Sequence, residues 1–547
     1  MFAKISLLKI SAWTITGLFA VPLLVLFASV TNIDTQVWSH LLSTVLASYV
    51  FNSLVLAIGV GIGTAVIGTY LAWFMVNYQF YGKSLLNWLI LLPLAMPAYI
   101  IAYTYTGMLD FSGPLQQLLR ALFNAPLNQQ MLPDIRSLEG AVVVMILVLY
   151  PYVYLLARTA FSEQSTQFTL VSKLAGLTPL QHMRQVALPL ARPSILTGAA
   201  LAMMEALADY GTVAYFGVNT FTTGIYRTWF GMGNAAAASQ LATMLCLVVF
   251  VLLWLERSSR KHHSRFQSRH ASTIKAKATT PLKSIGLFMI CALPAFFGFI
   301  IPFIQLLWWS TQYFDQDVFI EYLPLLATSL ELAFISSVLI VSLALTISYC
   351  KRRYASRKIA LATQFVGLGY ALPGVVIAVG VVQVAGVMDT NINRFTGALF
   401  DWQPGLLISG SITILVFAYA VRYLSVAMHN TDTGLERIKP NVDEVSASLG
   451  MGTAATLQKV HIPLLRASLV SAFILVFVDV LKELPATLIL RPFNFNTLAV
   501  KAFELASDER LMDAALPALA IVSVGILPVI LLTMLMDKPS ENSKQSN

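Results

Sequence analysis

The sequence contains little charge and few cysteines. Charged residues make up 11% of its 547 positions, and the three cysteines, Cys246, Cys291 and Cys350, have no CxxC spacing. A soluble globule of this length carries about twice that share of charged residues, so a water-soluble protein is excluded. Because the cysteines fall in or at the ends of apolar runs, we interpret them as inert packing residues.

Several catalytic and nucleotide-binding motifs are also missing. No GxxxxGK[ST] phosphate loop occurs, so any ATP must be hydrolysed by another subunit. The sequence shows no cluster of His, Cys and Asp with metal-ligand spacing and no nucleophile elbow, and His182 and His461 are isolated. A membrane enzyme therefore lacks support, and we expect neither a catalytic residue nor a bound cofactor.

Apolar residues, in contrast, make up 57% of the chain. A helix needs about 20 apolar residues to cross a hydrocarbon core about 30 Å thick. Twelve segments satisfy this requirement, which predicts an all-α, multi-pass membrane protein. The predicted spans are 8–30, 53–76, 85–107, 139–160, 194–218, 239–256, 284–309, 327–350, 360–388, 406–428, 469–490 and 514–536.

Lysine and arginine indicate the orientation, because short cytoplasmic loops are enriched in them. The basic segments include 158–193, 257–283 and 351–358, whereas outer loops such as 315–321 are acidic or mixed. Both termini are therefore predicted to face the cytoplasm. The net charge of +9 then indicates topology and contact with anionic membrane lipid, and we expect no nucleic acid partner.

The two halves of the sequence match each other at offsets of 276 and 274 residues. Matched pairs include Ser53 and Ser329, Pro97 and Pro373, Gly176 and Gly450, and Leu207 and Leu481. Six spans per half is an even number, so we predict two parallel six-helix repeats with the translocation path between them. The first repeat occupies 1–256, a basic cytoplasmic linker 257–283, and the second repeat 284–547.

Each repeat carries a polar loop, at 163–193 and at 429–468, with Gly and Pro at the same spacing. In the first copy Gly176 permits a turn between two short helices, and Leu188 and Pro189 are predicted to end the second of them. A single loop of this kind would be interpreted as an amphipathic helix lying on lipid. Two copies at matching positions favour docking to a two-fold partner.

The second loop resembles the EAA loop of ABC importer permeases, the coupling helix that sits in a groove of the ATPase subunit. The resemblance rests on Glu444–Gly450 and continues to Val460–Pro463, whereas the first copy, Leu170–Gly176, lacks the acidic residue. It implies a type I ABC importer permease fold, with two permease domains in one chain of a bacterial inner membrane. The implied partners are an ATPase homodimer and a periplasmic or extracellular binding protein. The implied coupling residues are Gly176, Leu188, Pro189, Glu444, Gly450 and Pro463.

Acidic residues inside apolar spans mark the candidate translocation path. Glu205 and Asp209 are four residues apart and are predicted to share a helix face, and the offset of 274 places Asp479 and Glu483 at the matching sites. With the phenol of Tyr210, these carboxylates would suit a hard, highly charged cation or an organic cation. An internal hydrogen-bond or salt-bridge network between helices is the structural alternative.

Four runs around these carboxylates resemble the signature of fused ferric-iron permeases. They are Met204–Gly217, Phe221–Gly233, Lys482–Asn494 and Leu498–Arg510. The resemblance implies ferric iron as the cargo, with transient ferric contacts at Glu205, Asp209, Asp479 and Glu483. Related fused permeases for thiamine and aminoethylphosphonate share the architecture and parts of these motifs, so both substrates stay open.

A twelve-span secondary transporter with two parallel halves is the alternative from another class. The paired Gly-to-Pro loops favour the ABC permease, because an ion-coupled carrier has no use for a repeated ATPase-docking helix. Stimulation of transport by ATP and a separate ATPase subunit would distinguish the two classes.

Overall fold

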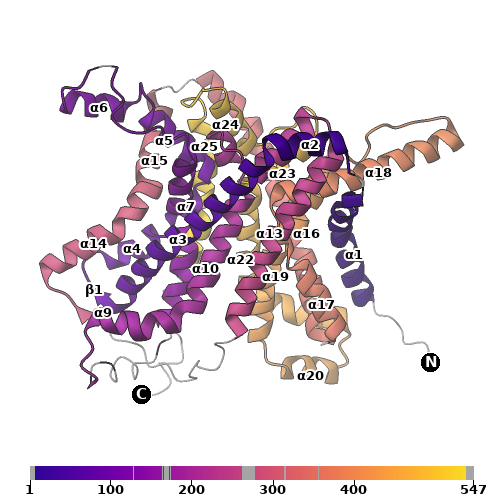
Figure 1. The fold of residues 1–547 in the computed structure, drawn as a ribbon. Helices are drawn as coiled ribbons and strands as arrows, with labels where there is room; N and C mark the ends of the chain where they lie inside the picture. The colour runs from indigo at the N-terminus through magenta and orange to yellow at the C-terminus, as the bar shows by residue number, and fades with distance from the viewer. Residues whose placement is uncertain are drawn as a thin grey trace. The chain divides into compact units, whose positions relative to one another are not determined.

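The computed structural model describes residues 7–536, except 32, 127, 163, 165–171, 173, 262–276, 313–315 and 355. Part of the first predicted loop (163–193) and most of the predicted linker (257–283) therefore lie outside the described residues. The described chain is helical (Figure 1), apart from β1 (Tyr78–Gln79) and β2 (Lys277–Ala278), which pair in parallel. Helices satisfy their backbone hydrogen bonds internally, which a chain this apolar requires in lipid.

The chain divides into two compact units, and each draws on both halves of the sequence. Unit 1 comprises residues 1–44, 224–246 and 315–501, and unit 2 comprises residues 45–223, 247–314 and 502–547. Packing therefore groups the chain differently from the boundaries at 256 and 284. The two repeats themselves stay a prediction from sequence similarity.

Unit 2 is built around three helices that pack pairwise, α3 (Leu46–Asn77), α7 (Leu138–Ser162) and α10 (Leu188–Ala208). Gly68 permits the close approach of α3 to α7, because a Cβ at this position would lie 2.7 Å from the backbone nitrogen of Tyr154. The remaining elements of unit 2 are α4 (Lys83–Leu89), η2 (Leu92–Ala95), α5 (Ala98–Leu109), α6 (Pro114–Leu122), α9 (Pro179–His182), η3 (Met183–Ala187), α11 (Gly211–Tyr215), α14 (Pro281–Ala295), η5 (Phe296–Ile300), α15 (Ile301–Gln312) and α25 (Ala515–Met536).

Unit 1 has the corresponding three-helix core, α16 (Gln316–Tyr354), α19 (Ile412–Arg437) and α22 (Ile462–Leu481). The N-terminal helix α1 (Leu7–Ala28) packs on α16, α17 and α18 of this unit. Three helices contribute residues to both units, namely α12 (Phe221–Tyr226), α13 (Ala235–Lys261) and α24 (Leu498–Ser507). The remaining elements of unit 1 are η1 (Ser29–Thr31), α2 (Thr35–Thr44), η4 (Arg227–Gly231), α17 (Arg357–Val366), η6 (Gly369–Ala371), α18 (Gly374–Phe400), α20 (Asn441–Ser448), α21 (Thr453–Thr456), η7 (Leu457–His461) and α23 (Pro485–Leu490).

The number of membrane spans is somewhat below the predicted twelve. Among the described residues, ten helices are long and apolar enough to cross a membrane, and one bent pair brings the number to eleven. This pair, Lys83–Ala95 and Ala98–Leu122, bends by 92° around Pro97. The twelfth predicted span, 514–536, corresponds to α25, whose apolar part Ala515–Ile530 is shorter. The all-α, multi-pass prediction is confirmed, with ten to eleven candidate spans.

Candidate functional site

The candidate carboxylates lie where two spans break. Helix α10 ends at Ala208, and Asp209 then adopts an extended conformation with ψ of 136° before α11 begins. Helix α22 ends at Leu481, and three residues separate it from α23, which begins at Pro485. Asp209 still donates its N–H to the Glu205 carbonyl at 3.0 Å, so the two residues remain one turn apart although the helix ends at Ala208.

Asp209 caps the short helix that follows the break. Its carboxylate accepts hydrogen bonds from the backbone N–H groups of Thr212 at 2.9 Å and Val213 at 3.4 Å, and from the Thr212 hydroxyl at 3.2 Å. Its carbonyl oxygen accepts a further bond from the hydroxyl of Thr222 at 2.8 Å. Because the first N–H groups of a helix have no partner within it, this arrangement stabilises the start of α11.

Glu483 performs the same capping in the second repeat, and it also holds a buried ion pair. Its carboxylate accepts a bond from the N–H of Ala486 at 3.1 Å, the position equivalent to Thr212. The guanidinium of Arg422 on α19 donates to it at 2.8 Å, and the hydroxyl of Tyr423 donates as well. Only 4% of Glu483 is exposed, and the positive charge of Arg422 offsets the desolvation cost of burying this carboxylate.

Gly374 leaves the space that the ion pair occupies. A Cβ at Gly374 would lie 2.2 Å from Nη1 of Arg422 and 2.6 Å from Oε1 of Glu483. The offset of 276 places Ala98 opposite Gly374, and the offset of 274 places Val148 opposite Arg422. At these equivalent positions the first repeat therefore has an alanine in place of the glycine and no cation, so among the described residues the ion pair is a feature of the second repeat.

The remaining predicted site residues have different surroundings. Glu205 lies half-buried on the last turn of α10, and Asp479 on α22 forms an ion pair with Lys482 at 2.8 Å. Tyr210 is buried, with its ring centroid 6.0 Å from that of Phe503. Within the described part of the chain, no group of three or more His, Cys, Asp or Glu side chains could hold a metal ion.

The two polar loops share the same backbone turn. Gly176 and Gly450 have φ of +73° and +75°, in the left-handed region where glycine is favoured. Each turn is closed by a hydrogen bond of 3.0 Å, from Leu177 N–H to the Ser172 carbonyl and from Met451 N–H to the Ser446 carbonyl. This bonding pattern is that of a glycine helix C-cap. The turn predicted at Gly176 is confirmed, and Gly450 adopts the same turn.

The predicted helix end at Leu188 and Pro189 is wrong. Helix α9 begins at Pro179 with a capping box between Thr178 and Gln181, and it continues through the π-turn η3 directly into α10. The second repeat uses the same device, since the π-turn η7 leads into α22 before Pro463. A π-turn widens the backbone, which lets a proline without an N–H group follow without breaking the helix.

Helix α20, which carries Glu444, is fastened to the spans by a polar cluster. Asp443 accepts hydrogen bonds from Nε and Nη2 of Arg352 at 3.0 and 2.6 Å, and from Nε2 of His461 at 2.8 Å. Arg352 also donates to the carbonyl of Ile438 at 3.0 Å and to that of Leu435. The cluster joins α16, the end of α19, α20 and η7, while Glu444 itself is exposed.

The hydrogen bonds of this cluster determine the charge of Asp443. Burial alone would raise the pKa of this carboxyl, but the bonds from Arg352 and His461 outweigh it and lower the pKa below its usual value. The first loop has a different anchor, a contact of 2.8 Å between Nδ1 of His182 and the Ser172 hydroxyl. The two loops therefore share a backbone turn but differ in the side-chain contacts that anchor them.

Comparison with known proteins identifies the family. Residues 57–261 match the family described as the binding-protein-dependent transport system inner membrane component. Over these residues the chain is an ABC importer permease. The permease is thus a non-catalytic transport subunit and a multi-pass inner-membrane protein, which excludes the secondary transporter. Binding-protein-dependent transport also implies an ATPase and a substrate-binding protein as partners.

Relatives of the permease transport several inorganic ions, according to their names. The Fe(3+)-transport system permease protein FbpB 2 of Haemophilus influenzae is 24% identical over 498 residues, covering 89% of this permease and 90% of the relative. The sulfate transport system permease protein CysT of Salmonella typhimurium is 28% identical over 167 residues, 30% of the permease and 57% of the relative. The molybdenum transport system permease protein ModB of Haemophilus influenzae is 24% identical over 185 residues, 34% of the permease and 78% of the relative.

Sequence reasoning found the carboxylates and glycines of the permease but missed their partners. Arg422 is 61 residues from Glu483, and Arg352 is 91 residues from Asp443. The signal available for Arg422 was a cation inside an apolar span, which requires a nearby anion. For Arg352 no such signal exists, because a basic residue at the cytoplasmic end of a span is ordinary.

Proposed function

We propose that the permease conducts ferric iron, delivered by a separate binding protein and driven by an ATPase homodimer that hydrolyses the ATP. The similarity to FbpB 2 carries this proposal, because it extends over 89% of the chain and therefore includes both repeats. The sulfate and molybdenum permeases match only about a third of the chain. The carboxylates near the span breaks also favour a cation over these oxyanions.

Within this function, Glu205 and Asp479 are the path residues that we propose. They occupy equivalent positions one turn before the breaks, and each is half-buried. We assign Asp209 and Glu483 a structural role at the breaks instead, because their carboxylates cap α11 and α23. We assign Tyr210, whose ring packs against Phe503, to the side-chain packing around the span break.

The two polar loops are the proposed docking sites of the ATPase subunits, on the cytoplasmic side with both termini. Glu444, Gly450 and Pro463 serve one subunit, and Gly176, Leu188 and Pro189 serve the other. The exposure of Glu444 and the left-handed turns at both glycines support this assignment, because a docking surface must be accessible and its backbone fixed. The polar cluster at Asp443 supports a firmer attachment of the second loop.

Uptake of radiolabelled ferric iron tests the proposal. Vesicles containing the permease, its ATPase and its binding protein should accumulate iron only with ATP, and unlabelled thiamine or aminoethylphosphonate should not compete. Vesicles without the permease are the control. Uptake of thiamine or aminoethylphosphonate in place of iron would overturn the substrate while leaving the permease assignment intact.

The same assay tests the path residues. The double substitution Glu205→Gln with Asp479→Asn should abolish iron uptake while the complex with the ATPase still assembles, because it removes the negative charge of the path and preserves the size of both side chains. A double variant that assembles and retains uptake would contradict the assignment of these two carboxylates.

A further inference from the structure

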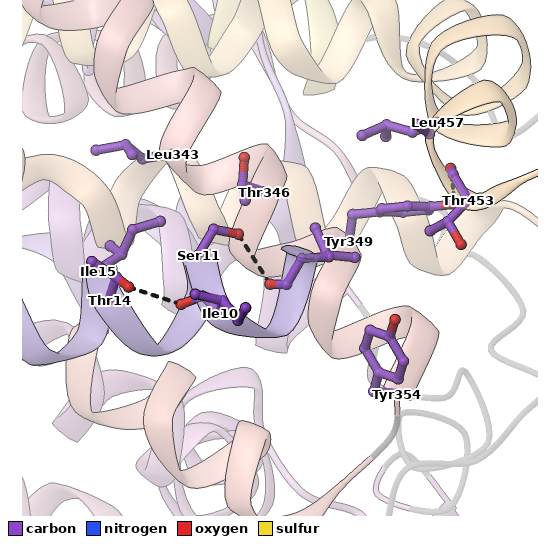
Figure 2. A pocket seen from close by; sticks show the side chains of 12 residues that line it. Ile10, Ser11, Thr14, Ile15, Leu343, Thr346, Tyr349, Tyr354, Thr453 and Leu457 are labelled. Carbon is purple, nitrogen blue, oxygen red and sulfur yellow. Dashed lines mark hydrogen bonds between the residues drawn. The ribbon is translucent and has the colours of Figure 1, made fainter. Parts of the chain in front are cut away.

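A groove in unit 1 lies beside the second polar loop. It encloses about 730 Å3 between α1, α16 and the start of α21 with η7. Figure 2 shows its walls, with Ile10, Thr14 and Ile15 from α1 facing Leu343 and Thr346 from α16. Tyr349, Tyr354 and Thr453 line the end nearest the loop. The groove therefore runs from the basic end of α16 along its apolar part.

The long wall of the groove suits a hydrocarbon chain. The Ser11 hydroxyl donates to the carbonyl of Leu8 and the Thr14 hydroxyl to that of Ile10, each at 3.0 Å, as the dashed lines in Figure 2 indicate. Both hydroxyls are thus satisfied by their own helix, and the lining offers mainly carbon. From Leu8 to Ile15 the α1 wall extends about 10 Å at about 1.5 Å per residue.

The end near the loop is basic. Nζ of Lys9 lies 4.2 Å from the centre of the Tyr354 ring and also interacts electrostatically with Cys350. Arg353 is exposed and interacts electrostatically with Tyr349, which lines the groove. The neighbouring Lys351 and Arg352 are paired with Asp432 and Asp443. The positions of Lys9 and Arg353 place positive charge beside the groove entrance.

We propose that this groove binds an anionic phospholipid of the inner leaflet, with one acyl chain between α1 and α16 and the phosphate beside Lys9 and Arg353. The inner leaflet is rich in anionic lipid, and basic residues at its surface attract such headgroups. An apolar groove with a basic entrance matches a phospholipid in both parts. The proposal rests on the proposed function only in placing the second loop on the cytoplasmic side.

The lipid would act on the coupling loop through Tyr349. The hydroxyl of this residue donates to the carbonyl of Thr453 at 3.1 Å, and its ring centroid lies 5.2 Å from that of His461. His461 in turn holds Asp443 on α20. A lipid that fills the groove therefore supports the segment joining α20 to α22, and its loss should lower ATPase activity in the assembled complex.

Binding is tested with the permease and its ATPase in nanodiscs containing spin-labelled phosphatidylglycerol in phosphatidylcholine. The variant Lys9→Gln with Arg353→Gln should weaken lipid immobilisation severalfold more than its matched control, because only these two residues flank the groove entrance. The matched control, Arg357→Gln with Lys358→Gln, removes the same charge from exposed residues that do not line the groove. Equal weakening in both variants would mean general surface attraction and would overturn the site.

A second pair of variants blocks the groove without changing charge. Thr14→Trp should displace the immobilised lipid, whereas Leu18→Trp, on the exposed part of α1 outside the groove, should not. Lipid retained in Thr14→Trp would overturn the acyl-chain position. If a variant loses the immobilised lipid of the groove but keeps its ATPase rate, the proposed effect of the lipid on the coupling loop is overturned. Lipid immobilisation requires neither ATP nor iron, so failure of this proposal is distinguishable from failure of iron transport.

Discussion

At the scale of single residues, the acidic residue at the span break has one role in the first repeat and two roles in the second. Asp209 and Glu483 both cap the helix that follows, but only Glu483 also neutralises a buried arginine. A carboxylate that only caps can be replaced by another acceptor, whereas one that pairs with a buried charge cannot.

Substitution of the two acids should therefore have unequal effects. Glu483→Gln should lower the free energy of unfolding by about 3 kcal/mol or more, since it removes the carboxylate that pairs with the buried Arg422. Asp209→Asn should cost less than about 1 kcal/mol, because Asn caps nearly as well as Asp. Thermal unfolding of the detergent-solubilised permease measures both. Similar losses would indicate that the Arg422 pair contributes little.

Asp443 should make stability depend on pH at the acid end. Its pKa is lower in the folded protein than in the unfolded chain, so its contribution is complete above the usual Asp range and disappears as pH falls through the lowered pKa. Thermal midpoints measured down to about pH 3 should therefore fall more steeply in the wild type than in Asp443→Asn. Parallel curves would show that the cluster does not stabilise the fold.

At the scale of secondary-structure elements, composition located the helices and missed their interruptions. Most predicted spans fall on long apolar helices because about 20 apolar residues in lipid have no other stable conformation. The predicted span 360–388, however, crosses the break between α17 and α18. The span predicted at 194–218 actually begins within Pro179–Ala208 and breaks at Asp209. The π-turns before Pro189 and Pro463 were not predicted, because hydropathy carries no information on backbone hydrogen-bond register.

The left-handed turn in the second loop provides a test of coupling. No atom lies within 4 Å of a Cβ built at Gly450, so a side chain meets backbone strain but no steric clash. Gly450→Val should lower the amount of substrate transported per ATP several-fold, because a β-branched residue strongly disfavours this conformation. Gly450→Asn should stay near the wild type, since asparagine tolerates it. Equal ratios in the two variants would rule out a role for the turn.

At the scale of the whole molecule, each compact unit is completed by helices from the other half of the sequence. In unit 1, α1 packs on α16, α17 and α18, and in unit 2, α15 and α25 pack on each other and on α5 and η2. The contact with α25 is close, because a Cβ at Gly525 would lie 2.3 Å from the carbonyl oxygen of Ala95. Neither half of the chain contains all the helices of a unit.

Dividing the chain within the 257–283 linker tests this exchange of helices. Each half expressed alone should be degraded or aggregated, because its core would expose apolar faces that the missing helices cover. The two halves expressed together should copurify and support transport, because the division cuts no membrane span. Co-purification is measured with a tag on one half. A half that is stable and monodisperse alone would contradict the packing described for the units.

The Arg422–Glu483 pair, which has no counterpart at the equivalent described positions of the first repeat, bears on how the two repeats could diverge in evolution. In a permease made of two identical subunits, every mutation appears on both sides of the path, so a feature useful on one side must be tolerated on the other. Encoding both repeats in one gene removes that restriction. Gly374, Arg422 and Glu483 could then be acquired together in the second repeat while Ala98 and Val148 stayed unchanged in the first.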